Sequence, residues 1–152
     1  MQGGCGLARK ASLVVLMVLL LPSLVSLLLA GCSSNSPEGA VNKYLSAQQS
    51  GNWDALKAAV VPQNLTKEQE ALAKEKFQQV KVKFEGLKTQ TTYDKSDKNK
   101  ATVVLTEGKV IYTAKILGET KTETADLKKL DKEQRTYDTV KIKNVWYVDT
   151  KV

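Results

Sequence analysis

The spacing of hydrophobic residues changes twice along this chain. Residues 11–30 form an apolar run that only a few polar positions interrupt. From residue 37 to residue 80 the apolar positions recur every three or four residues, which is the spacing of an amphipathic helix. Beyond residue 80 they alternate with polar positions, as in a half-buried strand. The pattern therefore predicts an apolar leader, then helices, then strands.

The first two helices are predicted from their end signals. Ser36 and Pro37 suit the N-cap and the first helical position, and Gly51 suits the position that ends a helix in the left-handed conformation. Asn52 is placed to cap a second helix, which Pro62 stops. Between these signals the apolar stripe of the first helix runs out at its last turn, where Gln48 falls in line with it. Two short amphipathic helices therefore follow one another.

A capping box predicts the third helix. Thr66 and Gln69 have the spacing at which each side chain bonds the backbone N–H of the other. The apolar positions after them have helical spacing, so we expect them to be buried. They are Leu72, Ala73, Phe77 and Val80.

The strands are predicted to bend at glycines. Val82 and Phe84 alternate with charged residues, and the alternation shifts by one at Gly86 and again near Gly108. A β-bulge at each glycine accounts for such a shift. A weaker strand is expected over residues 120–130, and a closing pair of strands turns at Lys143-Asn144. Helices followed by antiparallel strands indicate an α+β fold with the helices packed on a strongly bent antiparallel sheet.

The phase of the closing strands decides which aromatic residues enter the core. Trp146 is expected to share an inward face with Val148 and with Val140 and Ile142 of the preceding strand. Trp53 of the second helix is expected to be buried against the same concave face of the sheet.

The leader carries a more specific signal at its end. Arg9 and Lys10 precede the apolar run, and Leu29-Ala30-Gly31-Cys32 closes it. This ending resembles the lipobox of bacterial lipoproteins, in which the cysteine thiol accepts diacylglycerol. The resemblance implies cleavage before Cys32, acyl chains such as palmitate on that residue, and an anchor in the cell membrane on its extracytoplasmic side. The alternative is an uncleaved membrane-spanning anchor, because the run is about long enough to cross a bilayer.

These signals divide the chain into three parts. Residues 1–31 are predicted to be a lipoprotein signal peptide, residues 32–36 the lipidated cysteine with a polar tether, and residues 37–152 a single α+β domain. Once the leader is removed, Cys32 is the only cysteine, so the domain has no internal disulfide.

Two segments of the domain carry a second resemblance. The helix pair of residues 37–61, with Gly51-Asn52-Trp53-Asp54 at its joint, is similar to the opening of the nuclear transport factor two-like superfamily (the cystatin-like cone). Residues 144–148 resemble its last hairpin, although Asn144 stands where the superfamily often has glycine. Asn also tolerates the left-handed conformation. The resemblance implies a bent sheet wrapped on helices, with a pocket at the open end.

The charge and composition of the chain limit the classes of molecule that the domain is expected to bind. The 23 basic and 16 acidic residues include Arg9 and Lys10 of the leader, which leaves a net charge of +5 on the rest. A basic domain at the envelope suits anionic envelope polymers or envelope proteins, and a solvated lysine-rich face is the simpler alternative. Nucleic acid is not expected as a partner, because no stacking motif accompanies the lysines.

Catalytic chemistry has few candidates. Superfamily members include isomerases, dehydratases and epoxide hydrolases, which need a titratable pair inside the cone. The chain has no histidine, and Asp138 beside Tyr137 is its one candidate pair of a carboxylate and a phenol for acid–base chemistry. We therefore expect no enzyme but a non-catalytic binding or accessory module for a small ligand or an envelope protein. The alternative is a cone-fold isomerase or hydrolase with a buried carboxylate.

Metal and cofactor sites are not expected either. The polar loop with Asp94, Ser96, Asp97 and Asn99 lacks the spacing of a calcium loop. Tyr44 and Tyr112 are the residues considered for the mouth of a pocket, with core packing as the alternative.

The lipid site gives a direct prediction. Replacing Cys32 with Ser removes the only thiol that follows the apolar run, so the variant should accumulate as an uncleaved precursor without lipid. Metabolic labelling with a palmitate analogue, followed by mass measurement of the N-terminal peptide, checks this. Normal labelling of the variant would place the lipid elsewhere.

Overall fold

The computed structural model describes residues 35–116 and 119–150. The chain divides after residue 31 into two units, and every element described here belongs to the second, residues 32–152. That unit contains the whole of the core described below, so it carries the contacts needed to fold by itself. The predicted signal peptide and Cys32 lie outside the described residues. None of the described helices is long and apolar enough to cross a membrane.

Three helices come first in the described part of the chain, and each begins at its predicted cap. Ser36 and Asn52 each accept a hydrogen bond at 3.0 Å from the backbone N–H three residues later. Thr66 and Gln69 form both bonds of the capping box, and Gly51 ends the first helix at φ 65°. The helices are α2 (Pro37–Ser50), α3 (Trp53–Ala59) and α4 (Lys67–Gln79).

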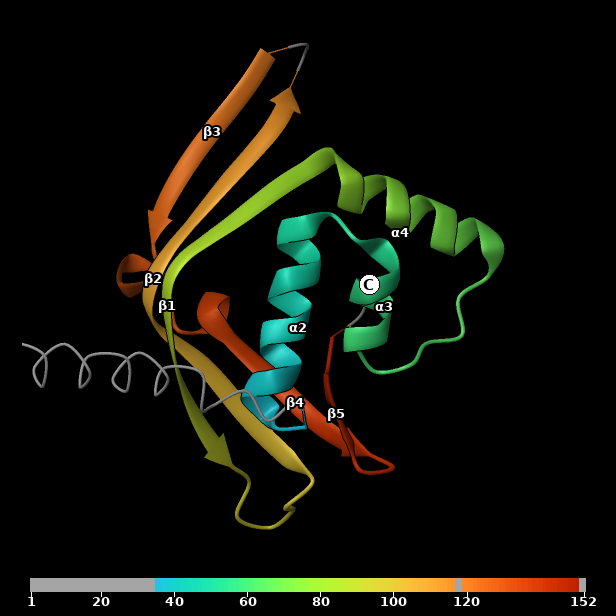
Figure 1. Cartoon of the computed structure of the whole chain (residues 1–152), viewed down its shortest axis with the longest axis vertical. Helices are drawn as coiled ribbons and strands as arrows, with labels where there is room; N and C mark the ends of the chain where they lie inside the picture. The colour runs from blue at the N-terminus through green and yellow to red at the C-terminus, as the bar shows by residue number, and fades with distance from the viewer. Residues whose placement is uncertain (1–34, 117–118, 151–152) are drawn as a thin grey trace, which may run out of the picture. The chain divides into compact units, whose positions relative to one another are not determined.

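The strands form one antiparallel sheet in the order β1-β2-β4-β5, with β3 also paired to β2. They are β1 (Val80–Tyr93), β2 (Lys100–Ile116), β3 (Glu119–Asp126), β4 (Thr136–Ile142) and β5 (Val145–Val148). The first part of β2 pairs with β4 and its last part with β3, while β1 follows both parts. The β1–β2–β3 arm therefore extends beyond the rest of the sheet (Figure 1).

The strand predicted over residues 120–130 is shorter than expected. β3 ends at Asp126, whose side chain accepts a hydrogen bond from the N–H of Lys128 at 2.9 Å and starts a short 3₁₀ turn. This turn buries Leu127. The apolar end of the predicted strand therefore lies in the connection after β3, where Leu127 packs into the core, and not in the sheet.

The sheet curls at two glycines. Gly86 has φ 62° and Gly108 has φ 124°, and the β1–β2 register shifts between Glu85 and Lys88. A Cβ atom on Gly108 would lie 2.8 Å from the carbonyl oxygen of Glu85, closer than such atoms approach. The predicted bulge at Gly86 is confirmed, whereas the second register shift, between Lys88 and Thr89, leaves Thr106 of β2 as the extra residue instead of Gly108. The α+β fold with helices on a strongly curled antiparallel sheet is confirmed.

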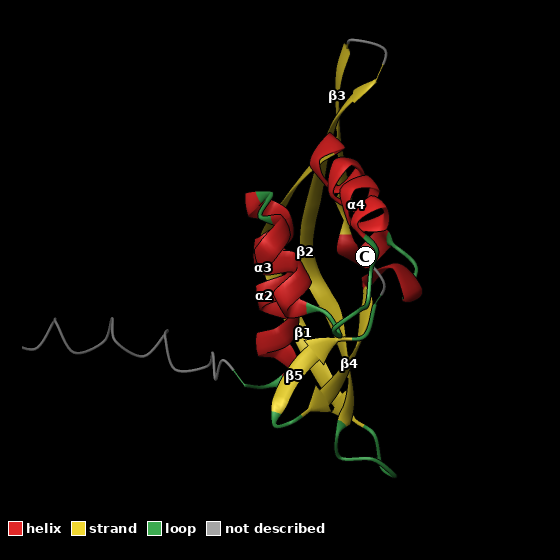
Figure 2. Ribbon diagram, turned by 90° about the vertical axis from the view of Figure 1, so that its right-hand side faces the viewer, coloured by secondary structure: helices red, strands yellow, loops and turns green. Residues whose placement is uncertain are grey.

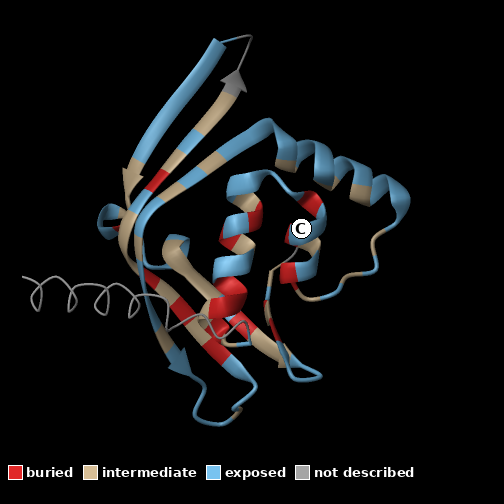
Figure 3. Cartoon of the chain, viewed as in Figure 1, coloured by how far each residue is buried: buried red, intermediate tan, exposed pale blue. Residues whose placement is uncertain are grey.

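The main core forms where α2 lies inside this curl. Val41 and Val103 are 0% exposed, and the buried residues concentrate between α2 and the sheet (Figure 3). Thr139, the one buried polar residue among the described positions, donates its hydroxyl to the carbonyl oxygen of Ala101 at 2.7 Å. The cluster consists of Ala40, Val41, Leu45, Val60, Ala101, Val103, Leu105, Val110, Leu127, Trp146 and Val148.

Both tryptophans are buried as predicted, but they do not share one face. Trp146 is 8% exposed in the main core, whereas Trp53 is 5% exposed in a second cluster with Ala47 and Leu56. The prediction that Trp53 packs on the sheet is wrong, because α2 lies between α3 and the sheet (Figures 1 and 2).

The predicted phase of β4 is also wrong. Trp146 pairs with Lys141, while Ile142 pairs with Val145 on the opposite face and is 37% exposed. The buried inward position of β4 is Thr139, which shares its face with Tyr137 and donates its hydroxyl to the backbone. Single apolar residues are common on surfaces, so alternation alone does not identify the inner face of so short a hairpin.

The two glycines give a stability prediction. Gly86→Ala places a Cβ in open space and costs only the left-handed conformation, about 1–2 kcal/mol. Gly108→Ala adds a backbone collision and should cost more, roughly 2–5 kcal/mol. Denaturant unfolding of residues 33–152 measures both. Equal midpoints for the two variants would show that Gly108 does not constrain the curl.

Candidate functional site: the cleft beneath α4

Helix α4 departs from the core and leaves an apolar face uncovered. None of its residues is buried: Leu72 is 54% exposed, and Ala73 and Phe77 are half-buried. The prediction that this stripe is buried is wrong, also for Val80, which starts β1 and is 41% exposed. The reason is connectivity, because α4 continues into the projecting end of β1 without a loop (Figure 1).

A cleft of about 380 Å³ lies between α4 and the helix pair α2–α3. We call it the helix cleft. It is mainly apolar, with two amides, one phenol and one ammonium group among its lining side chains. The lining residues are Tyr44, Gln48, Trp53, Leu56, Gln69, Leu72, Ala73, Lys76 and Phe77.

The apolar part of the helix cleft is built by aromatic packing. Trp53 and Leu56 of α3 are 5% and 4% exposed and belong to the second core cluster. The rings of Trp53 and Phe77 lie 5.7 Å apart at 52°, a tilted arrangement favourable for aromatic pairs. Phe77 is therefore the main apolar contact that joins α4 to the helix pair.

Tyr44 connects the helix cleft to the concave face of the sheet. Its hydroxyl accepts a hydrogen bond from Gln48 Nε2 at 3.1 Å, and its ring lies edge-on to Tyr137, with centroids 5.8 Å apart. Burial raises the pKa of Tyr44, and burial with the nearby Tyr44 and Tyr112 raises the pKa of Tyr137 to about 12. Both phenols are thus neutral at physiological pH. Tyr44 lines the cleft as considered from the sequence, while Tyr112 does not.

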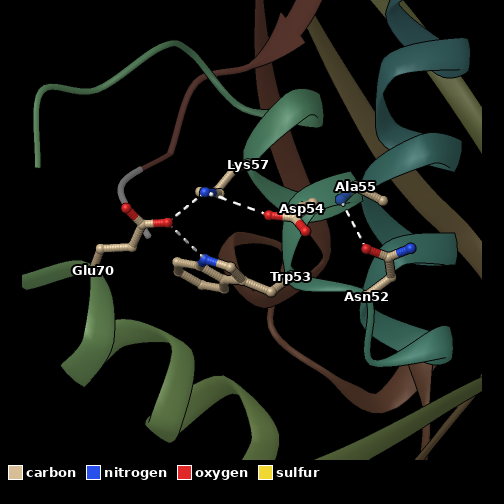
Figure 4. Close-up of polar contacts among 6 residues, drawn as sticks. All are labelled: Asn52, Trp53, Asp54, Ala55, Lys57 and Glu70. Carbon is tan, nitrogen blue, oxygen red and sulfur yellow. Dashed lines mark hydrogen bonds and ion pairs between the residues drawn. The ribbon is translucent and has the colours of Figure 1, made fainter. Parts of the chain in front are cut away.

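A polar cluster attaches α4 beside the cleft (Figure 4). Trp53 donates its indole N–H to Glu70 Oε1 at 3.3 Å, and the ammonium group of Lys57 binds the same oxygen. Lys57 also pairs with Asp54 at 3.5 Å. The hydrogen bond from Lys57, then that from Trp53, lowers the pKa of Glu70. Glu70 therefore joins α4 to α3 through an ion pair and an indole.

The carboxylate and phenol considered for acid–base chemistry are not brought together. Tyr137 and Asp138 are adjacent in β4, so their side chains lie on opposite faces of the sheet. Tyr137 is half-buried on the concave side, whereas Asp138 is exposed and accepts the hydroxyl of Thr102 at 2.9 Å. The sequence neighbours therefore cannot act on one substrate.

The acidic loop is organised as a turn. Asp94 accepts hydrogen bonds from the N–H groups of Ser96 and Asp97 at 2.7 and 3.0 Å and from the Ser96 hydroxyl. The hydroxyl of Ser96, and after it the two N–H groups, lowers the pKa of Asp94, so its carboxylate is committed to the loop. Within residues 35–116 and 119–150, no group of three or more acidic, cysteine or histidine side chains is arranged to hold a metal ion.

A larger hollow, of about 530 Å³, lies at the other end of the sheet. Its lining includes Asp94, Asp138 and Asp149 together with Lys100 and Lys132. The charges are of both signs and no buried aromatic residue forms a floor, so the hollow offers no consistent chemistry to one ligand. The helix cleft is the better candidate.

The comparisons with known proteins do not name the site. No known family model matches this chain, and no curated protein matches it. The sequence pattern identified Tyr44, but it missed Gln69 and Lys76 as lining residues. Gln48 could have been predicted as a lining residue, because it is a polar residue in line with an apolar stripe. Nothing in the sequence distinguishes Lys76, because it is one of several lysines in the same helix.

The Glu70 cluster predicts a pH effect on the position of α4. Because the folded pKa of Glu70 lies below its usual 4.5, the stabilisation is present above that value and is lost as the pH falls through the folded pKa. Trp53 fluorescence, read in a Trp146→Phe background, should change over this acidic range. Glu70→Gln should remove that transition. An unchanged acid titration in Glu70→Gln would mean that the attachment lies elsewhere.

Proposed function

We propose that this protein is a lipid-anchored envelope lipoprotein whose domain is a non-catalytic binding module, with a small apolar ligand in the helix cleft. The observation that carries the proposal is the apolar stripe of α4, which borders a mainly apolar cleft and leaves Leu72 54% exposed, while Ala73 and Phe77 pack against the second core cluster. Leu72 is half-exposed beside the buried Trp53 and Leu56. Exposed apolar surface next to a buried apolar cluster is typical of a binding site for an apolar ligand.

The anchor rests on the leader. The ending Leu29-Ala30-Gly31-Cys32 supports lipidation, and each buried methylene contributes about 0.8 kcal/mol to membrane binding. Lipoproteins carry two or three acyl chains, which makes attachment effectively permanent. Residues 32–36 span at most about 18 Å even when fully extended, so the domain stays close to the headgroups. The resemblance to the nuclear transport factor two-like superfamily agrees with a pocket-bearing module.

The side chains of the helix cleft favour binding over catalysis. Among the residues that the structure describes, Tyr44 and Lys76 are the ionisable ones in its lining, and burial raises the pKa of Tyr44. Acid–base enzymes instead need a pair of titratable groups whose surroundings push their two pKa values apart, so that one group acts as the acid and the other as the base. The nearby Glu70 is held in an ion pair by Lys57.

Filling the cleft tests the proposal. Ala73 is half-buried in the lining, so Ala73→Trp should occupy the space of a ligand and abolish binding. Ala71→Trp adds the same volume to the same helix at an exposed position outside the lining and is the matched control. The readout is native mass spectrometry of the protein purified without denaturant from its own envelope.

The outcome is decided by the bound mass. We expect a small molecule to copurify with the parent chain and with Ala71→Trp, and to be absent from Ala73→Trp. A ligand retained equally by both variants would place the site outside the helix cleft. A parent chain that carries no ligand, and binds none from an envelope lipid extract, would overturn the binding function.

A further inference from the structure

We propose that the ligand of the helix cleft is a single-chain amphiphile with an anionic headgroup, a carboxylate or a phosphate. This inference rests on the proposed binding function and adds the chemical class of the ligand. The hydrocarbon chain lies against Trp53, Leu56 and Phe77, and the headgroup meets Lys76 at the rim.

The cleft has the dimensions and surface for one apolar chain. Its volume of about 380 Å³ is near the lower end for small-molecule sites, which suits one chain better than a two-chain lipid. The floor is closed by the packed rings of Trp53 and Phe77. Leu72, 54% exposed on α4, has no apolar cover in the described structure, and a chain in the cleft would supply it.

The charge at the rim selects the headgroup. Within the described part of the chain, Lys76 is the one cationic residue of the lining, and it stands one helical turn after Leu72, so the two share a face of α4. Among the described residues, no acidic side chain pairs with Lys76 within salt-bridge distance. Lys57, which lies beside the cleft, is paired with Asp54 and Glu70. An anionic group at Lys76 would therefore complete an ion pair that the fold leaves open.

Polar groups in the lining suit a headgroup better than a hydrocarbon. Gln69 uses its side-chain oxygen in the capping box, which leaves its NH₂ group as a donor. The Tyr44 hydroxyl accepts from Gln48 and keeps its own proton to donate. Donors and one ammonium group, with no carboxylate in the lining, favour an anion and disfavour a cation.

A headgroup series at constant chain length tests this. Residues 33–152 with Trp146→Phe leave Trp53 as the only tryptophan, at the floor of the cleft. Palmitate, hexadecanol and hexadecyltrimethylammonium are titrated below their aggregation concentrations, and Trp53 fluorescence is followed. We expect palmitate to bind roughly 1.5- to fivefold more tightly than hexadecanol, the range of one partly exposed ion pair. The cation should bind most weakly, and added salt should narrow the difference.

Matched lysine variants locate the charge effect. Lys76→Gln should bring palmitate binding down to that of hexadecanol and leave hexadecanol unchanged. Lys74→Gln changes the net charge equally on the same helix, outside the lining, and should leave the preference intact. Lysophosphatidate then separates a phosphate from a carboxylate preference.

A failure of this inference can be distinguished from a failure of the proposed binding function. Equal binding of all three probes, or equal effects of the two lysine variants, overturns this inference and leaves the binding function standing. Binding of no probe, together with no ligand in the envelope extract, overturns both.

Discussion

The burial of α2 in the curl of the sheet is the interaction on which the other features depend. Val41 of α2 and Val103 of β2 are completely buried, and the main core gathers around them. A flat sheet would contact α2 along a narrow strip, whereas the bends at Gly86 and Gly108 curl the sheet so that β1 and β5 both contact the helix. Because α2 occupies the concave face, α3 has only the far side of α2 left to pack on.

That displacement creates the site. Trp53 is too far from the sheet to join the main core, so it closes a second cluster with α2 and with Phe77 of α4. α4 must also start β1 without a loop, which prevents it from settling into the groove between α3 and α2. The helix cleft is thus a consequence of connectivity, held at one end by the aromatic contact and beside it by Glu70.

Local signals predicted the elements because their causes are local. Ser36, Asn52 and Thr66 cap helices through bonds three residues away, and Gly86 and Gly108 mark phase shifts within two strands. The failures concern which face an apolar residue covers. Ile142 and Leu72 follow the expected spacing yet are exposed, since spacing defines a stripe but not the element that covers it. That choice depends on the layer order, which the strand pairing and the connection of α4 to β1 determine.

The chemistry of the cleft was harder to predict for a related reason. Tyr137 and Asp138 are neighbours in sequence, but strand alternation separates them across the sheet, while Tyr44 and Tyr137 meet from elements far apart in the chain. Lys76 is one lysine among many, and what distinguishes it is its place in the lining of the cleft, where no carboxylate accompanies it. In a lysine-rich domain, the charge that matters to a ligand is the one that borders an apolar cleft, and only the folded arrangement of the helices identifies it.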